Sequence, residues 1–217
     1  MAVARRCRGG APADQEGGLL TRLFSYVVRY DVGFAPNPFH GSCTLATCKP
    51  RIRQTARAGD WVMGTAAAGQ RRGCRLVYAM RVDERLTFQQ YWDDPRFRRK
   101  RPTMRASLKM AYGDNIYRRD ANGQWLQEDS RHTLADGSRN LGHVLRDTSA
   151  DAVLISWHFS YFGGDGPAVP VALRTAYGQD LVAGRGHRCR FSKKHVEAAT
   201  AWLGGLERGY LSDPADW

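Results

Sequence analysis

Long apolar runs and common cofactor-binding motifs are absent from this 217-residue sequence. No apolar run approaches the roughly 20 residues of a membrane-spanning helix, and the basic N-terminus lacks the apolar centre of a secretion signal. GxGxxG and GxxxxGK[ST] loops are missing, which excludes the usual dinucleotide and nucleoside triphosphate chemistries. The five cysteines are odd in number and irregularly spaced, which argues against a disulfide framework. We therefore expect a soluble cytoplasmic protein with no cofactor and no membrane partner.

A complete metal-ligand pattern is missing as well. Cys43 and Cys48 with His40 could hold a metal in principle, but no second CxxC or HxxxH pair completes a tetrahedral set, so we expect no metal. We interpret both cysteines as small packing residues rather than nucleophiles. A reactive thiolate needs a lowered pKa, which nearby cations permit but do not demonstrate.

Positive charge is what the sequence has in excess. Lys and Arg number 33 against 21 Asp and Glu, which gives a net charge of +12. Such a chain attracts polyanions, nucleic acid first and an acidic membrane surface second. Arginine dominates and suits bidentate phosphate contacts, although a GC-rich genome also produces an arginine-rich protein. Composition alone does not choose between these explanations.

The length fits a single domain. Residues 1–18 are rich in Gly, Ala and Arg, with almost no large apolar side chain, and are predicted to be a disordered basic leader. The domain then occupies residues 19–217. Its C-terminal part contains a helix predicted over 192–206, with Ser192 as the cap and apolar residues at helical spacing.

The remaining pattern predicts several short strands and few helices. β-branched and aromatic segments predict strands at 24–30, at 58–64 paired with 74–82 as a hairpin, and at 152–162. Residues 45–58 have helical spacing, Pro95 and Pro102 prevent one continuous helix over 87–105, and 113–142 reads as a long polar insertion with a short strand at 124–127. We predict an α+β domain around a small, strongly bent β-sheet or barrel, with flanking helices.

A segment of alternating rings and cations predicts contact with nucleic acid. Flat rings can stack on bases while cations hold phosphates, and the alternative is a solvated basic loop whose rings anchor it to the core. The candidates here are Tyr91, Trp92, Arg96, Arg98, Arg99, Lys100 and Arg101.

Two other segments add binding candidates. Lys49, Arg51 and Arg53 lie beside Pro50, so that a stiff turn could present them to phosphates or bases. Asn37 and His40 could hydrogen-bond to a base edge, or could merely cap turns.

The strand expected at 152–162 alternates between two faces, and one face is core while the other could line a pocket. His158 and Tyr161 lie on opposite faces of this strand, and both are binding candidates.

The polar stretch between 113 and 142 holds the catalytic candidates. Asp114 or Asp129 could activate water for attack at a sugar carbon, and His132 could protonate a leaving base. Asn115 and Tyr117 are further binding candidates from this stretch. The alternative is that such Asp and Asn residues only form turns.

A family resemblance rests on segments spread over most of the chain. The most specific are CTLATCKPRIR, YWDDPRF and HFSYFG, within a series that runs in order from about Tyr26 to about Arg188. This series resembles the second family of nucleotide-modification-associated domains. The resemblance implies a role tied to modified bases in DNA, in phage or bacterial base-modification systems, without an established reaction or catalytic set.

A weaker similarity concerns GDWVMG followed by LVYAMRV. This order is similar to the PUA superfamily, including the modified-base readers of the EVE type, in which a small bent barrel holds one flipped base. The similarity is an analogy of fold, and the polar insertion departs from that pattern.

Three functions remain open at this level. The domain could recognise a modified or flipped base in DNA, or it could be an enzyme, glycosidase-like or a transferase, that acts on a modified base or nucleotide. It could also be an accessory protein that binds a partner protein from a base-modification operon. Nucleic acid, as DNA with a modified base, is the partner that we expect.

Overall fold

Two β-sheets form the centre of the fold in the computed structural model, which describes residues 20–67 and 73–217. The leader expected at 1–18 lies outside the described residues. The larger sheet has six strands in the order β10 (His187–Arg188), β1 (Leu23–Val27), β3 (Trp61–Thr65), β4 (Leu76–Arg81), β9 (His158–Tyr161) and β11 (Gly209–Tyr210).

Pairing in this sheet is mixed. β1 and β3 are parallel, with Leu23 opposite Trp61, because the chain between them crosses to the second sheet before it returns. β3 and β4 are antiparallel neighbours, as the predicted hairpin requires, and β4 pairs antiparallel with β9. The edge strands β10 and β11 contribute two residues each.

The second sheet consists of β2 (Cys43–Leu45), β8 (Val153–Ser156) and β5 (Glu84–Leu86), with β8 in the middle. The single strand expected at 152–162 is wrong in this respect, because the chain leaves the small sheet after β8 and enters the large one at β9. Trp157 is the residue between them, and its backbone N–H donates to Asp83 Oδ2 at 2.7 Å. This side-chain bond replaces the ladder bond that the change of sheet interrupts.

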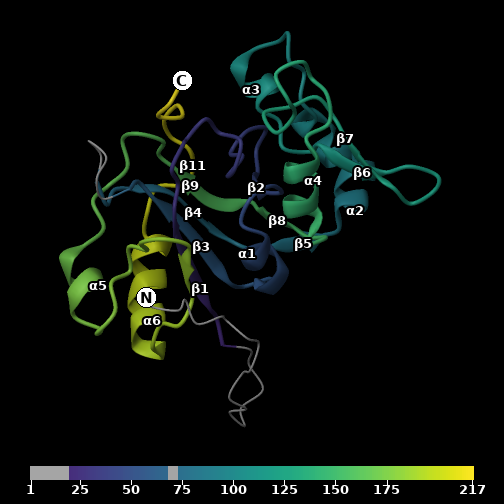
Figure 1. Ribbon diagram of the computed structural model, residues 1–217. Coiled ribbons are helices and arrows are strands. Elements are labelled where there is room, and N and C mark those ends of the chain that lie inside the picture. The colour runs from purple at the N-terminus through teal and green to yellow at the C-terminus, as the bar shows by residue number, and fades with distance from the viewer. Residues whose placement is uncertain (1–19, 68–72) are drawn as a thin grey trace.

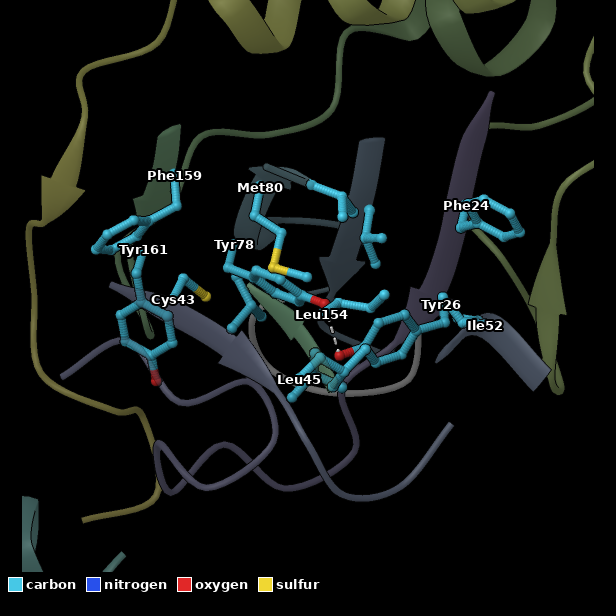
Figure 2. Close-up of a cluster of buried hydrophobic side chains, with 14 of the residues drawn as sticks. Phe24, Tyr26, Cys43, Leu45, Ile52, Tyr78, Met80, Leu154, Phe159 and Tyr161 are labelled. Atoms are coloured by element: carbon cyan, nitrogen blue, oxygen red, sulfur yellow. Dashed lines mark hydrogen bonds between the residues drawn. The ribbon is translucent and has the colours of Figure 1, made fainter. Parts of the chain in front are cut away.

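The main hydrophobic core lies between the two sheets (Figure 2). Aromatic residues of the large sheet meet apolar residues of β2, β8 and α1 (Pro50–Thr55) there, and the rings of Tyr26 and Tyr78 lie edge to face. The hydroxyl of Tyr78 donates to that of Tyr26 at 2.9 Å, which satisfies polar groups that burial would otherwise leave without a partner.

Helices cover the outer face of each sheet, as Figure 1 shows. α5 (Val171–Thr175) and α6 (Lys193–Gly204) pack on the large sheet through residues such as Leu173 and Leu203. The small sheet is covered by α2 (Phe88–Asp93), η1 (Pro95–Lys100), α4 (Leu141–Thr148) and the hairpin of β6 (Tyr117–Arg119) and β7 (Trp125–Gln127). The short helix α3 (Leu108–Ala111) follows η1.

Local signals explain the breaks between these helices. A capping box between Thr87 and Gln90 begins α2, and Pro95 begins η1. The helix expected over 192–206 corresponds in position to α6, whose first turn Ser192 caps by accepting from the His195 N–H.

The α+β class is confirmed, while the barrel is not. Among the described residues no sheet closes on itself, since β10 and β11 leave the two edges of the large sheet apart. The resemblance to PUA and EVE domains is therefore unsupported by the fold. The helices within residues 20–67 and 73–217 are also too short or too polar to span a bilayer.

Candidate functional site

A cysteine, a histidine and an aspartate from three distant segments meet beside the small sheet. Cys48 lies between β2 and α1, His132 lies in the loop before α4, and Asp147 lies in the last turn of α4. Cys48 is half-buried, His132 is buried and Asp147 has no exposed surface. We call these three residues the Cys-His-Asp cluster.

The histidine bridges the other two members. Its Nδ1 lies 2.6 Å from Asp147 Oδ2, and its Nε2 lies 3.7 Å from Cys48 Sγ. The carboxylate can only accept, so Nδ1 carries the proton in this contact, and in the neutral ring Nε2 is left as the acceptor that faces the thiol. This is the order of a nucleophile, a base and a group that orients the base.

The turn that carries Cys48 has an unusual backbone. Cys48 has φ 55° and Lys49 has φ 38°, two consecutive non-glycine residues in the left-handed region. Such residues persist only where surrounding contacts hold them. One such contact is the Cys48 N–H, which donates to Asp147 Oδ1 at 3.0 Å, so the aspartate holds both the base and the backbone of the cysteine.

Arg53 joins the segments around the Cys-His-Asp cluster through hydrogen bonds. Its buried guanidinium donates to four carbonyl groups, those of Cys48, Asp147, Ala150 and Ala152, at 2.5–2.9 Å. Burial lowers the pKa of Arg53 to about 10, against the opposing charge of Asp147. The side chain remains a cation at neutral pH, and it joins the Cys48 turn to α4 and β8.

The charges within the cluster support one another. Burial opposes ionisation of Asp147, but its bond to His132 and the charges of His132, Arg146 and Arg53 outweigh burial and lower its pKa. Burial likewise opposes protonation of His132, and the bonds to Asp147 and Cys48 outweigh it and raise its pKa. His132 is thus a stronger base than a free imidazole.

Two more side chains complete the surroundings. Tyr117 donates its hydroxyl to Asp147 Oδ2 at 3.0 Å, and burial raises the pKa of this phenol. The His143 ring lies 4.0 Å from the His132 ring, centroid to centroid. Ligand atoms of His132, His143 and Asp147 lie within 4.8 Å of one another, the spacing of a possible metal site.

The sequence-based catalytic candidates are separated by the fold. Of the three, His132 lies in the Cys-His-Asp cluster. Asp114 is fully buried and accepts from Thr44 Oγ1 and from the Tyr91 hydroxyl, each at 2.7 Å, and burial raises its pKa. Asp129 is exposed and accepts from Thr133 at 3.0 Å.

Several binding candidates are brought together, but in the interior. Lys100 is buried and donates to Asn37 Oδ1 at 2.8 Å and to the carbonyls of Asn37 and Ser42. Burial lowers the pKa of Lys100 to about 8, against the charge of Asp114. Asn115 donates to the Tyr91 carbonyl at 3.0 Å. These side chains tie the β2 loop to α2 and η1, and contact with a ligand would require this interior to open.

Other candidates also have internal contacts. Arg53 and Tyr117 hold the Cys-His-Asp cluster as described above, and Tyr161 is buried with its hydroxyl donating to Asp31. Lys49 is half-buried, with Nζ 4.4 Å from the centre of the Tyr26 ring.

The candidates nearer the surface contact different partners in the structure. Arg96 is paired with Asp94 and Glu84, Trp92 lies 3.8 Å from the Arg101 guanidinium, and His158 Nδ1 lies 3.1 Å from Asp83. His40 lines a recess that excludes the Cys-His-Asp cluster. Among the candidate cations, Arg51, Arg96, Arg98 and Arg99 are exposed. The binding roles of all these residues remain predictions.

Sequence reasoning missed two residues of the cluster and the neighbouring His143. Cys48 was interpreted as a packing residue, and Asp147 and His143 were not singled out. The available signal was a cysteine with a histidine and an aspartate elsewhere in the chain, but 84 residues separate Cys48 from His132. A pattern of spacing does not reveal such a meeting.

Comparisons with known proteins give one match. The model of the family described as nucleotide modification associated domain 2 matches residues 20–217. No curated protein and no solved structure matches the chain.

Proposed function

Because the chain belongs to the nucleotide modification associated domain 2 family, whose description points to nucleotide modification systems, we propose that it is an enzyme acting on a base or nucleotide through Cys48. The single observation that carries this proposal is the pair of contacts that joins Cys48 Sγ to His132 Nε2 and His132 Nδ1 to Asp147 Oδ2. Nucleophile and base are within reach of each other, and the base is held by a third group.

The proposed step is a covalent addition. His132 Nε2 takes the thiol proton while Cys48 Sγ forms a bond to an electrophilic carbon of the substrate. The electron pair of the attacked double bond moves to its other atom, and the imidazolium returns the proton there. Asp147 is a positioning residue, because it holds the histidine tautomer and stabilises the imidazolium without touching the substrate.

Nucleic acid or a nucleotide is the substrate class that we propose. The net charge of +12 attracts phosphates, and Arg98 and Arg99 on η1 are exposed. In this proposal the role tied to modified bases is enzymatic, and recognition of the base serves the chemistry at Cys48.

Intact-protein mass spectrometry and nucleoside analysis test the proposal directly. The purified chain is incubated with DNA that carries a panel of modified bases, and with the corresponding free nucleotides. We expect an altered nucleoside or a covalent adduct with the wild-type protein and with Cys74→Ser, and neither with Cys48→Ser. Turnover that survives in Cys48→Ser would overturn the proposal.

Thiol alkylation provides a test that needs no substrate. Cys48 and Cys74 are both free and half-buried, so Cys74 is a matched control. We expect iodoacetamide to modify Cys48 faster than Cys74, and His132→Gln to slow only Cys48. Equal rates at the two cysteines, unchanged by His132→Gln, would contradict an activated nucleophile.

A metal centre is the second candidate, and His143 is the observation that favours it. His132, His143 and Asp147 are ligand types that zinc accepts, and their ligand atoms lie within 4.8 Å of one another. The fit is tested by zinc titration of the wild type and His143→Ala. Tight binding that depends on His143, with activity lost to chelators, would favour the metal over the thiol nucleophile.

A further inference from the structure

A recess with a volume of about 360 Å³ lies beside the loop that follows Asn37, at the end of β9 and β11. Its lining shares no residue with the Cys-His-Asp cluster. The volume is within the range of small-molecule sites. Two of the sequence segments singled out above, the Asn37 loop and HFSYFG, contribute to it together with the chain near the C-terminus.

Aromatic side chains supply much of the wall. The rings belong to Phe39, Trp157, Phe159 and Tyr210. Phe39 and Phe159 are buried, while Trp157 is 44% exposed at the point where the chain changes sheets. An exposed indole beside a recess offers a flat face to which a planar ring can stack.

Cations lie at the same recess. Lys109 and Arg208 are among its lining residues and both are exposed. Lys109 Nζ lies 4.3 Å from the centre of the Tyr210 ring, and 3.9 Å from a carboxylate oxygen of exposed Asp213. An ion pair of that length at the surface is weak, so Lys109 remains able to exchange Asp213 for another anion.

His40 lies close to several cations at the recess. It lines the recess and has φ 62°, a left-handed backbone that turns the loop at this point. Burial and the charges of Lys100, Arg99 and Lys109 lower the pKa of His40 to about 4. The imidazole is therefore neutral at pH 7, and the cations that contribute to this shift also favour an anion nearby.

We propose that this recess binds a nucleotide, with the base stacked on Trp157 and the phosphate held by Lys109 and Arg208. Flat rings with adjacent cations match a planar heterocycle that carries an anionic group, and neither feature alone would select that combination. The recess is a second site, distinct from Cys48, so the proposal does not depend on the proposed covalent chemistry.

Equilibrium binding of two fluorescent probes tests it: a labelled mononucleotide and a labelled single-stranded oligonucleotide. Loss of stacking in Trp157→Ala should weaken binding by roughly 5- to 150-fold, while Trp157→Phe, which keeps a ring, should retain most of the affinity. Tyr30→Ala removes another exposed ring, 68% exposed and outside the recess, and should change nothing. A preference for the mononucleotide or for the oligonucleotide identifies the source of the ligand.

Further measurements distinguish the contacts to the phosphate from the contacts to the base. Lys109→Ala with Arg208→Ala should weaken nucleotide binding but leave weak nucleoside binding unchanged. The proposal is overturned if the wild type shows no saturable binding of either probe, if Trp157→Ala binds as well as Tyr30→Ala, or if inorganic phosphate competes fully while a nucleoside does not compete. Cys48→Ser should bind the probes normally, so failure at this site and failure of the proposed enzyme are distinguishable.

Discussion

Asp147→Asn is the substitution that most directly tests the Cys-His-Asp cluster. It preserves size but removes the charge from a carboxylate that accepts from His132 Nδ1 at 2.6 Å, the Tyr117 hydroxyl at 3.0 Å and the Cys48 N–H at 3.0 Å. The new amide NH₂ also faces donors, so at least one bond is lost. Breaking a buried ion pair by removing one partner costs about 3–5 kcal/mol.

We take the lower end of that range, about 3 kcal/mol, because the amide oxygen still accepts one or two of these bonds. For a chain of this length 1 kcal/mol corresponds to a Tm change of about 2–4 °C. The expected Tm decrease is therefore roughly 6–12 °C, measured by thermal unfolding followed by circular dichroism.

Exposed Asp129 provides the matched control, since Asp129→Asn removes the same charge from a surface loop. Its expected effect is within about 0.5 kcal/mol. The second readout is the iodoacetamide rate of Cys48, measured well below the variant's Tm, which should fall at least about tenfold in Asp147→Asn because His132 loses the partner that orients it. A variant that retains both the wild-type Tm and the wild-type alkylation rate would refute the reasoning.

Three further predictions concern the fold, the surface and pH. Arg53→Met should destabilise the chain by about 3 kcal/mol or more, because four buried carbonyls lose their donor; urea unfolding checks this against the exposed Arg51→Met, which should have little effect. If Arg98 and Arg99 contact duplex phosphates, replacing both by Ala should make the slope of log DNA affinity against log salt concentration less steep by about 2 in a filter-binding titration. A wild-type affinity that is insensitive to salt would contradict nucleic-acid binding. The folded pKa of His40 is about 4, below that of the unfolded chain, so its contribution to stability declines as pH falls from 6.5 toward 4. After allowance for partial exposure, His40→Gln should reduce the stability lost between pH 7 and pH 5 by about 1 kcal/mol in urea unfolding. Equal losses in both proteins would show that His40 is not responsible.

The sequence by itself determined those features that depend on neighbouring residues. The pairing of β3 with β4, the α+β class and the family followed from local patterns and motifs, as did the interruption of the helix near Pro95. Each of these is decided within a few residues or by a segment compared with its relatives.

Tertiary structure alone decided which polar residues would be buried. Lys100 and Arg53 read as surface cations in the sequence, yet both are buried because carbonyl groups from distant segments accept their hydrogen bonds. A charge can enter an interior only when such partners are present. The partners of Lys100 come from 58 and 63 residues away, and no local pattern identifies them.

The same reason explains the candidate sites. Cys48, His132 and Asp147 are ordinary residues in their own segments, and they become a possible nucleophile, base and positioning group only where β2, the His132 loop and α4 meet. Chemistry of this kind depends on distances of 3–4 Å between side chains. The order of residues supplies the chemical groups, and packing of the two sheets with their helices sets the distances between them.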